Sequence, residues 1–166
     1  MKKEIKINKN KLKAIIAIGI VSASLILFFA INANNPSQIK EESIPSDMRE
    51  VTLYKDSNCG CCDGHAKMYE EAGFEIEIIE SDDMHAIKEE HDISRDLQSC
   101  HTAIMGEYVV EGHVPLEGIK MLIETRPNIR GIALPGMPIG TPGMPGLKTE
   151  TYNIKNIDSK ETIMEI

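Results

Sequence analysis

The stretch Val51–Gly73, VTLYKDSNCGCCDGHAKMYEEAG, contains the clearest structural pattern in this chain. Its first residues, Val51–Tyr54, are β-branched, apolar or aromatic, which predicts a strand. Asp63–Ala72 predicts a helix that ends at the glycine closing the stretch. The segment Cys59-Gly60-Cys61-Cys62 lies between the predicted strand and the predicted helix. A strand, a cysteine-rich turn and a helix therefore follow one another within one short segment.

Further elements follow this stretch in alternating order. They are a strand at Phe74–Ile79, a helix at Met84–His91, a hairpin of Thr102–Met105 with Tyr108–Val110, and a helix at Leu116–Thr125. The resulting order β-α-β-α-β-β-α is typical of thioredoxin and glutaredoxin domains. We therefore expect an α/β fold, specifically a thioredoxin/glutaredoxin-like domain.

The charge of the chain is unevenly distributed. The 166 residues include 18 Lys or Arg and 26 Asp or Glu, for a net charge of −8, which argues against a nucleic-acid partner. Residues 1–33 contain six lysines and one glutamate, a net charge of +5, and subtracting this from −8 leaves −13 on the rest of the chain. The amino-terminal segment and the remainder are thus predicted to face different environments.

An apolar run explains the asymmetry. Ala14–Ile31, AIIAIGIVSASLILFFAI, is uncharged, and as a helix it would rise about 27 Å, close to the bilayer core. Lysines before such a run orient it with its amino terminus in the cytoplasm, so the acidic remainder is predicted to be exported. The run is longer than a typical signal-peptide core and favours a single transmembrane anchor. The alternative is a secreted or periplasmic protein cleaved between Ala33 and Asn34.

These patterns divide the chain into four parts. Residues 1–33 form the cytoplasmic stub and anchor, and residues 34–50, which are polar and contain prolines, form a linker. Residues 51–148 form the folded domain. Residues 149–166 form an extension, either an added edge strand or a loose end.

The cysteine-rich turn supports two kinds of chemistry. A helix amino terminus stabilises thiolate, which is both the nucleophile of disulfide exchange and a ligand for soft metals. Three thiolates at Cys59, Cys61 and Cys62 would repel one another, and Cu(I) would offset their charge, although zinc and iron–sulfur clusters also accept thiolates. Alternatively, a Cys59–Cys62 disulfide staples the start of the helix in an oxidising compartment.

Other ligand candidates lie further along the chain. Cys100 precedes the hairpin and is a candidate fourth sulfur ligand, a resolving thiol or a buried structural cysteine. Its neighbour His101 either binds a metal or caps the strand. The weaker candidates are His65, His113 and the methionines Met137 and Met144. These methionines occupy two copies of PGMP, and their thioethers suit Cu(I) or serve as packing.

Several motifs occur in a recognisable order: Cys59–Cys62, Ser99–Ala103 (SCHTA), Tyr108–Pro115 (YVVEGHVP), Leu134–Pro138 (LPGMP) and Pro142–Met144 (PGM). Together they resemble the CopG-type metal-binding proteins of bacterial copper-resistance loci, once described only as a domain of unknown function. The resemblance covers about Val51–Gly146. It implies a thioredoxin-like fold, an exported location, copper bound by the C-x-C-C cysteines with Cys100, and a redox role for copper or thiols.

Two functional hypotheses follow. In the first, Cys59, Cys61, Cys62 and Cys100 hold Cu(I), as one ion or a small multinuclear cluster, for copper resistance and for exchange with other copper-handling proteins. Zinc and iron–sulfur clusters are less favoured. In the second, the protein is a membrane-tethered thiol–disulfide oxidoreductase, in which Cys59 attacks and Cys62 resolves. The sequence leaves open whether the chain is an enzyme.

Overall fold

The structure is a computed structural model that describes residue 39 and residues 43–166. Its elements are α2 (Ser46–Arg49), β1 (Glu50–Lys55), α3 (Gly60–Glu71), β2 (Glu75–Glu80), α4 (Met84–Glu90), β3 (Thr102–Met105), β4 (Tyr108–Glu111), α5 (Leu116–Thr125), β5 (Gly131–Ala133), β6 (Asn153–Asn156) and β7 (Thr162–Glu165). The predicted alternation of strands and helices from β1 to α5 is therefore observed. Helix α3 begins at Gly60, ahead of the predicted Asp63, so the cysteines occupy its cap and first turn.

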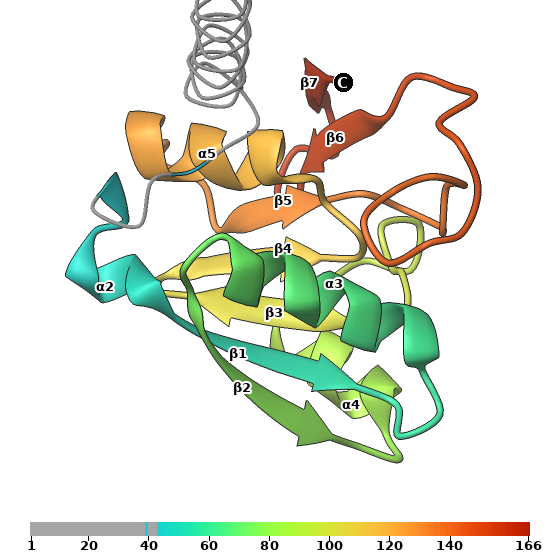
Figure 1. Cartoon of the computed structure of the whole chain (residues 1–166). Helices are drawn as coiled ribbons and strands as arrows, with labels where there is room; N and C mark the ends of the chain where they lie inside the picture. The colour runs from blue at the N-terminus through green and yellow to red at the C-terminus, as the bar shows by residue number, and fades with distance from the viewer. Residues whose placement is uncertain (1–38, 40–42) are drawn as a thin grey trace, which may run out of the picture. The chain divides into compact units, whose positions relative to one another are not determined.

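The strands that the structure describes form one mixed sheet in the order β2-β1-β3-β4-β5-β6-β7 (Figure 1). Strand β1 pairs in parallel with β2 and antiparallel with β3, and β4 pairs antiparallel with β3 and in parallel with β5. Helices α3 and α5 cover one face of the sheet and α4 covers the other. The outer strand β2 contains no buried residue.

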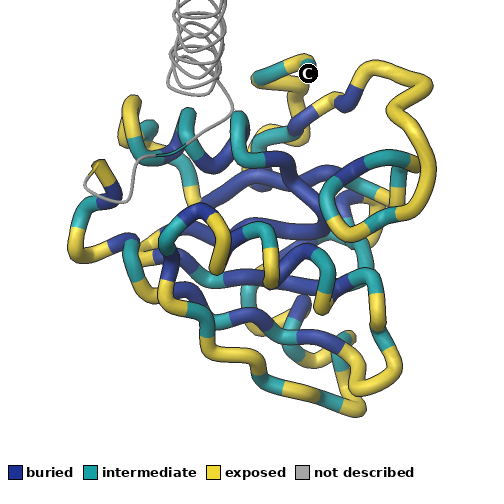
Figure 2. Tube along the Cα trace, viewed as in Figure 1, coloured by how far each residue is buried: buried dark blue, intermediate teal, exposed yellow. Residues whose placement is uncertain are grey.

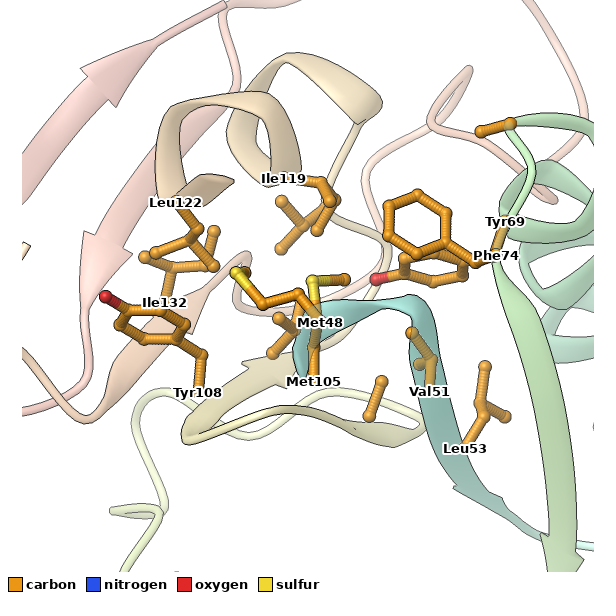
Figure 3. Packing of buried hydrophobic residues seen from close by; sticks show 14 of the residues in the cluster. Met48, Val51, Leu53, Tyr69, Phe74, Met105, Tyr108, Ile119, Leu122 and Ile132 are labelled. Atoms are coloured by element: carbon orange, nitrogen blue, oxygen red, sulfur yellow. The ribbon is translucent and has the colours of Figure 1, made fainter. Parts of the chain in front are cut away.

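The main core lies between the sheet and the helices α3 and α5. Tyr69 of α3, Leu122 of α5 and Met105 of β3 are fully buried there, among the side chains in Figure 3. A smaller cluster, which includes Leu97 and Ala133, lies on the α4 face. Figure 2 shows the central strands buried and the outer loops exposed. Because the central strands β3 and β4 are buried on both faces of the sheet, their sequences are nearly continuous apolar runs.

The folded unit extends beyond the predicted residues 51–148 at both ends. Within the predicted linker 34–50, Ile44 and Met48 are buried, because these apolar side chains pack into the main core. In the predicted extension 149–166, β6 and β7 continue the sheet, so this segment is not a loose end. Strand β5 was not predicted, because its three residues are too few to show periodicity.

The predicted anchor Ala14–Ile31 lies outside the described residues. Among the helices that the structure describes, none has the length and apolar character needed to span a bilayer.

Candidate metal centre

The C-x-C-C segment forms the amino-terminal end of α3. Cys59 is the N-cap residue, and Cys61 and Cys62 lie in the first turn. Cys59 and Cys62 form a disulfide, with their Cα atoms 5.4 Å apart. The free sulfur of Cys61 lies 3.5 Å from the sulfur of Cys59. Cys62 is buried, whereas Cys59 and Cys61 are half-buried.

The sheet brings the fourth cysteine to the same place. The register of β1 against β3 places Tyr54 opposite Thr102, so the end of β1 and the start of β3 lie at one edge of the sheet. Cys100, just before β3, therefore reaches the start of α3. The sulfur atoms of Cys59, Cys61, Cys62 and Cys100 all lie within 4.8 Å of one another.

Two histidines join the cysteines in a second group. The ligand atoms of Cys62, Cys100, His101 and His113 also lie within 4.8 Å of one another. His101 directly follows Cys100, and His113 lies in the turn between β4 and α5. Both histidines are fully buried. The sulfur of Cys100 is 2.8 Å from Nε2 of His113 and 3.5 Å from Nδ1 of His101.

His65 of α3 is also fully buried, but it does not belong to either group. Its Nδ1 lies 2.7 Å from Nε2 of His101, and its Nε2 lies 2.9 Å from the carbonyl oxygen of Val114. Both ring nitrogens therefore have hydrogen-bond partners. The structure therefore does not place His65 in either ligand group, and the hydrogen bonds account for both of its ring nitrogens.

Burial keeps the histidines neutral. It lowers the pKa of His65 to about 3, and it lowers the pKa of His101 well below the usual value, with further lowering from His65 and His113. Burial also lowers the pKa of His113. Burial and the nearby Cys61 raise the pKa of Cys100 to about 12, so without a metal this residue is a thiol that donates to the His113 ring. Neutral imidazoles carry the lone pairs that metal ligation requires.

The loop of residues 134–148, which contains both PGMP copies, lies over the start of α3 (Figure 1). A Cβ on Gly143 would lie 2.3 Å from the carbonyl oxygen of Cys61, and a Cβ on Gly64 would lie 2.8 Å from the Cα of Gly143. Only glycines permit this close approach. Met137 is 54% exposed, and Met144 is half-buried next to Gly143. Met144 directly follows Gly143, the residue that approaches α3, whereas Gly136, next to Met137, has nothing within 4 Å of its Cβ position.

Charged residues support the cysteines from the other face of the sheet. Lys88 of α4 donates to Glu111 of β4 at 2.6 Å and to Thr102 of β3 at 3.1 Å, and all three side chains are buried. Glu111 also accepts the backbone N–H of Ser99 at 2.6 Å, next to Cys100. This ion pair could not be predicted from the sequence. Glu111 stands in the YVVEGHVP motif, but nothing in the sequence shows that Lys88 is buried.

The donor set determines what the site can bind. Reduction of the Cys59–Cys62 disulfide would provide four convergent sulfurs, and thiolate sulfur favours soft cations such as Cu(I). The second group adds imidazole nitrogen, which suits zinc and copper. The arrangement therefore provides the ligand types that a soft metal ion needs, and the disulfide gives it an oxidised form.

Comparisons with known proteins found one family model and two solved structures that are similar to this chain. A family model described as "Protein of unknown function, DUF411" matches residues 97–144, which include Cys100, His101 and His113. A solved structure of copper resistance protein CopG, form 1, is 33% identical with a TM-score of 0.65, covering 70% of this chain and 96% of that chain. Form 2 of the same protein is 35% identical, also with a TM-score of 0.65, covering 70% of this chain and 97% of that one. Comparison with curated proteins found no significant match.

Proposed function

Because the chain belongs to the CopG-type copper-resistance family, we propose that it handles copper as its cargo and binds it as Cu(I). One observation carries the proposal: the sulfurs of Cys59, Cys61, Cys62 and Cys100 lie within 4.8 Å of one another. A dithiol oxidoreductase needs only two of these thiols. A soft, low-charge cation that binds several thiolates accounts for all four.

The overlap of the two ligand groups supports binding of more than one copper ion. Cys62 and Cys100 belong to both groups, and a thiolate sulfur can bridge two metal ions. Zinc and iron–sulfur clusters also accept sulfur ligands, but the solved relatives are copper resistance proteins. Copper therefore has the stronger support.

The proposal includes a fold and a location. The strand order β2-β1-β3-β4, with α3 between β1 and β2, supports a thioredoxin-like domain. The lysine-rich start and the apolar run Ala14–Ile31 support export and tethering by one transmembrane helix. Sequencing the amino terminus of the mature protein tests the tether: a start at Asn34 would replace the anchor with a cleaved signal peptide.

A second candidate function is thiol–disulfide exchange. The closed disulfide at the start of α3 favours it, with buried Cys62 and half-buried Cys59. In the exchange, the Cys59 thiolate would attack a substrate disulfide and Cys62 would release the product. The same dithiol could instead reduce copper: two thiols and two Cu(II) ions give the disulfide, two Cu(I) ions and two protons.

The test is an anaerobic titration of the full-length, fully reduced chain with Cu(I), in competition with a chromophoric Cu(I) chelator. We expect Cys61→Ser and Cys100→Ser each to lower the stoichiometry or to weaken the affinity at least tenfold, because each removes one sulfur donor. The matched control is His85→Gln, a substitution of an exposed histidine on α4, which should bind like the parent chain.

Unchanged binding in both serine variants would overturn the four-cysteine site. Turnover of a peptide disulfide, measured in parallel, tests the second candidate. Loss of that turnover in Cys59→Ser, with Cu(I) binding at the parental level, would favour exchange over copper binding.

A further inference from the structure

We propose that Glu111, which lies outside both ligand groups, is a positioning residue for copper binding: its buried carboxylate fixes the segment Ser99–Thr102, which contains Cys100. Lys88 of α4 holds this carboxylate in place. The inference rests on the proposed function, because it assumes that Cys100 takes part in binding copper. It assigns a role to two charged residues on the face of the sheet opposite to helix α3.

The carboxylate of Glu111 holds this segment at both ends. Its Oε1 accepts the backbone N–H of Ser99 at 2.6 Å. Its Oε2 accepts the hydroxyl proton of Thr102 at 2.7 Å. The two residues between these ends, Cys100 and His101, are the ones that enter the ligand groups. One fully buried side chain therefore brackets the ligand-bearing part of the segment.

The backbone bonds of the sheet reach this segment only after Cys100. Strand β3 begins two residues after Cys100, and the N–H of Gly112 donates to the carbonyl oxygen of His101 at 3.0 Å. The bond from the Ser99 N–H to Glu111 lies on the other side of Cys100. The backbone before Cys100 is therefore tied to β4 by a side chain, whereas the backbone after it is tied by strand pairing.

Lys88 compensates the buried charge and ties the arrangement to α4. Its ammonium donates to Oε1 of Glu111 at 2.6 Å and to the hydroxyl oxygen of Thr102 at 3.1 Å. The Lys88 side chain is only 6% exposed, so the ion pair is almost completely out of water. Because the Thr102 hydroxyl accepts from Lys88, its own proton is directed to Glu111. The three side chains therefore hold one another in a single arrangement.

Stability alone is a poor explanation for this arrangement. Taking two charges out of water is costly, and apolar side chains of similar volume often stabilise a protein at least as well as a buried ion pair. Apolar side chains cannot, however, offer a directed acceptor to the Ser99 N–H and the Thr102 hydroxyl. A binding site needs its ligands held to within about 0.5 Å. The ion pair is therefore better explained by the position that it gives to Cys100.

Two double variants distinguish the acceptor at position 111 from the charge. Lys88→Met with Glu111→Gln and Lys88→Met with Glu111→Leu both remove the whole ion pair, so neither leaves a buried charge unpaired. Glutamine keeps a carbonyl oxygen for the Ser99 N–H, and its amide N–H can donate to the Thr102 hydroxyl, whereas leucine offers neither group. The two variants therefore differ mainly in the hydrogen bonds that position 111 can form.

The experiment is an anaerobic titration of the full-length, fully reduced chain with Cu(I), in competition with a chromophoric Cu(I) chelator. We expect the glutamine variant to bind like the parent chain. The leucine variant should bind about 10- to 100-fold more weakly, which is the usual effect of losing an outer hydrogen-bond partner at a metal site. Lys67→Met, in an exposed ion pair on α3, is the control for the loss of a lysine and should not change the affinity.

Amide hydrogen exchange in the metal-free chain provides a readout that a purely stabilising role would not move. The Ser99 N–H should be protected in the parent chain and in the glutamine variant. In the leucine variant it should exchange faster, while the amides within β3 keep their parental rates. A change confined to Ser99 would locate the effect at the segment that carries Cys100.

The outcomes distinguish this inference from the proposed function. Equal Cu(I) affinities in the two double variants, whether parental or lowered, would overturn the positioning role and leave the proposed function standing. If the leucine variant does not fold, Thr102→Val removes one of the two bonds from the segment to Glu111, and parental affinity in that variant would overturn the role. Absence of Cu(I) binding in the parent chain would overturn the proposed function itself.

Discussion

Gly143 is the residue through which the loop of residues 134–148 rests on helix α3. Its φ is +84°, in the left-handed region, and a Cβ there would come within 2.3 Å of the Cys61 carbonyl and 2.7 Å of the His65 nitrogen. Gly136, in the other PGMP copy, has a similar φ of +72° but nothing within 4 Å of the Cβ position. Comparing the two positions therefore distinguishes the energetic cost of a side chain in the left-handed region from the cost of a steric clash with α3.

Alanine substitutions at these two glycines make a matched pair. We expect Gly136→Ala to lower the free energy of unfolding by about 1–2 kcal/mol, the cost of a side chain in the left-handed region. Gly143→Ala should cost more, because the loop must also move off α3. It should also speed the reaction of Cys61 with a thiol reagent. Equal costs, with no change in the Cys61 reaction rate, would show that the loop does not press on α3.

At this scale the sequence predicts which residue types matter but not how they are linked. Cys59, Cys61, Cys62 and Cys100 are distinctive because cysteine has few roles, and their spacing places them near a helix start. The contact between His65 and His101 spans 36 positions and could not be predicted. The acceptor at Val114 is a backbone carbonyl, which every residue has, so no side chain identifies it.

At the scale of helices and strands, prediction and structure agree best where the sequence pattern is strongest. Helix α5 has the predicted bounds Leu116–Thr125, because it begins after one proline and ends before another with a clear apolar face between them. Strand β5 and the pairing of β6 with β7 could not be predicted, because they are short and are stabilised by contacts with β4 and with each other. Tertiary pairing, rather than local propensity, forms these strands.

The link between α4 and β4 is a buried ion pair whose removal should be costly. Lys88→Met leaves the fully buried Glu111 carboxylate without its cation, so we expect a loss of about 3–5 kcal/mol in the free energy of unfolding, measured with urea. Lys67→Met, in an exposed pair with Glu71 on α3, is the control and should cost less than about 0.5 kcal/mol.

The double variant Lys88→Met with Glu111→Leu distinguishes the contribution of the ion pair to stability from the contribution of side-chain packing. Replacing both charges by apolar side chains should recover much of the loss, because no buried charge is left unpaired. If the double variant is less stable than Lys88→Met alone, the hydrogen bond from Ser99 to Glu111 contributes more than the ion pair.

At the scale of the whole molecule, the carboxy-terminal strands belong to the same folding unit as the cysteine site. Ile154 of β6 is fully buried in the main core, and Tyr152 donates its hydroxyl to the carbonyl of Ile139 at 2.7 Å. Ile139 lies in the loop of residues 134–148 that covers the start of α3. The last strands thus help hold the loop over the site.

Two isoleucine substitutions test this integration. Ile154→Ala should lower the free energy of unfolding by about 2–5 kcal/mol, because it leaves a cavity in the main core. Ile163→Ala in β7, where the side chain is 42% exposed, should cost less than about 1 kcal/mol. Urea unfolding should show one transition in both variants. A separate early transition in Ile154→Ala would mean that the last strands unfold independently.

The unburied strand β2 has a consequence for the behaviour of the protein in concentrated solution. Among the strands that the structure describes, β2 has a neighbour on one side only, and the free backbone groups of such an edge are a template for aggregation. Its sequence, EIEIIE, places Glu75, Glu77 and Glu80 on exposed positions of that strand. A second copy approaching edge to edge would bring like charges together. The glutamates of β2 therefore oppose the edge-to-edge association of two copies of the chain.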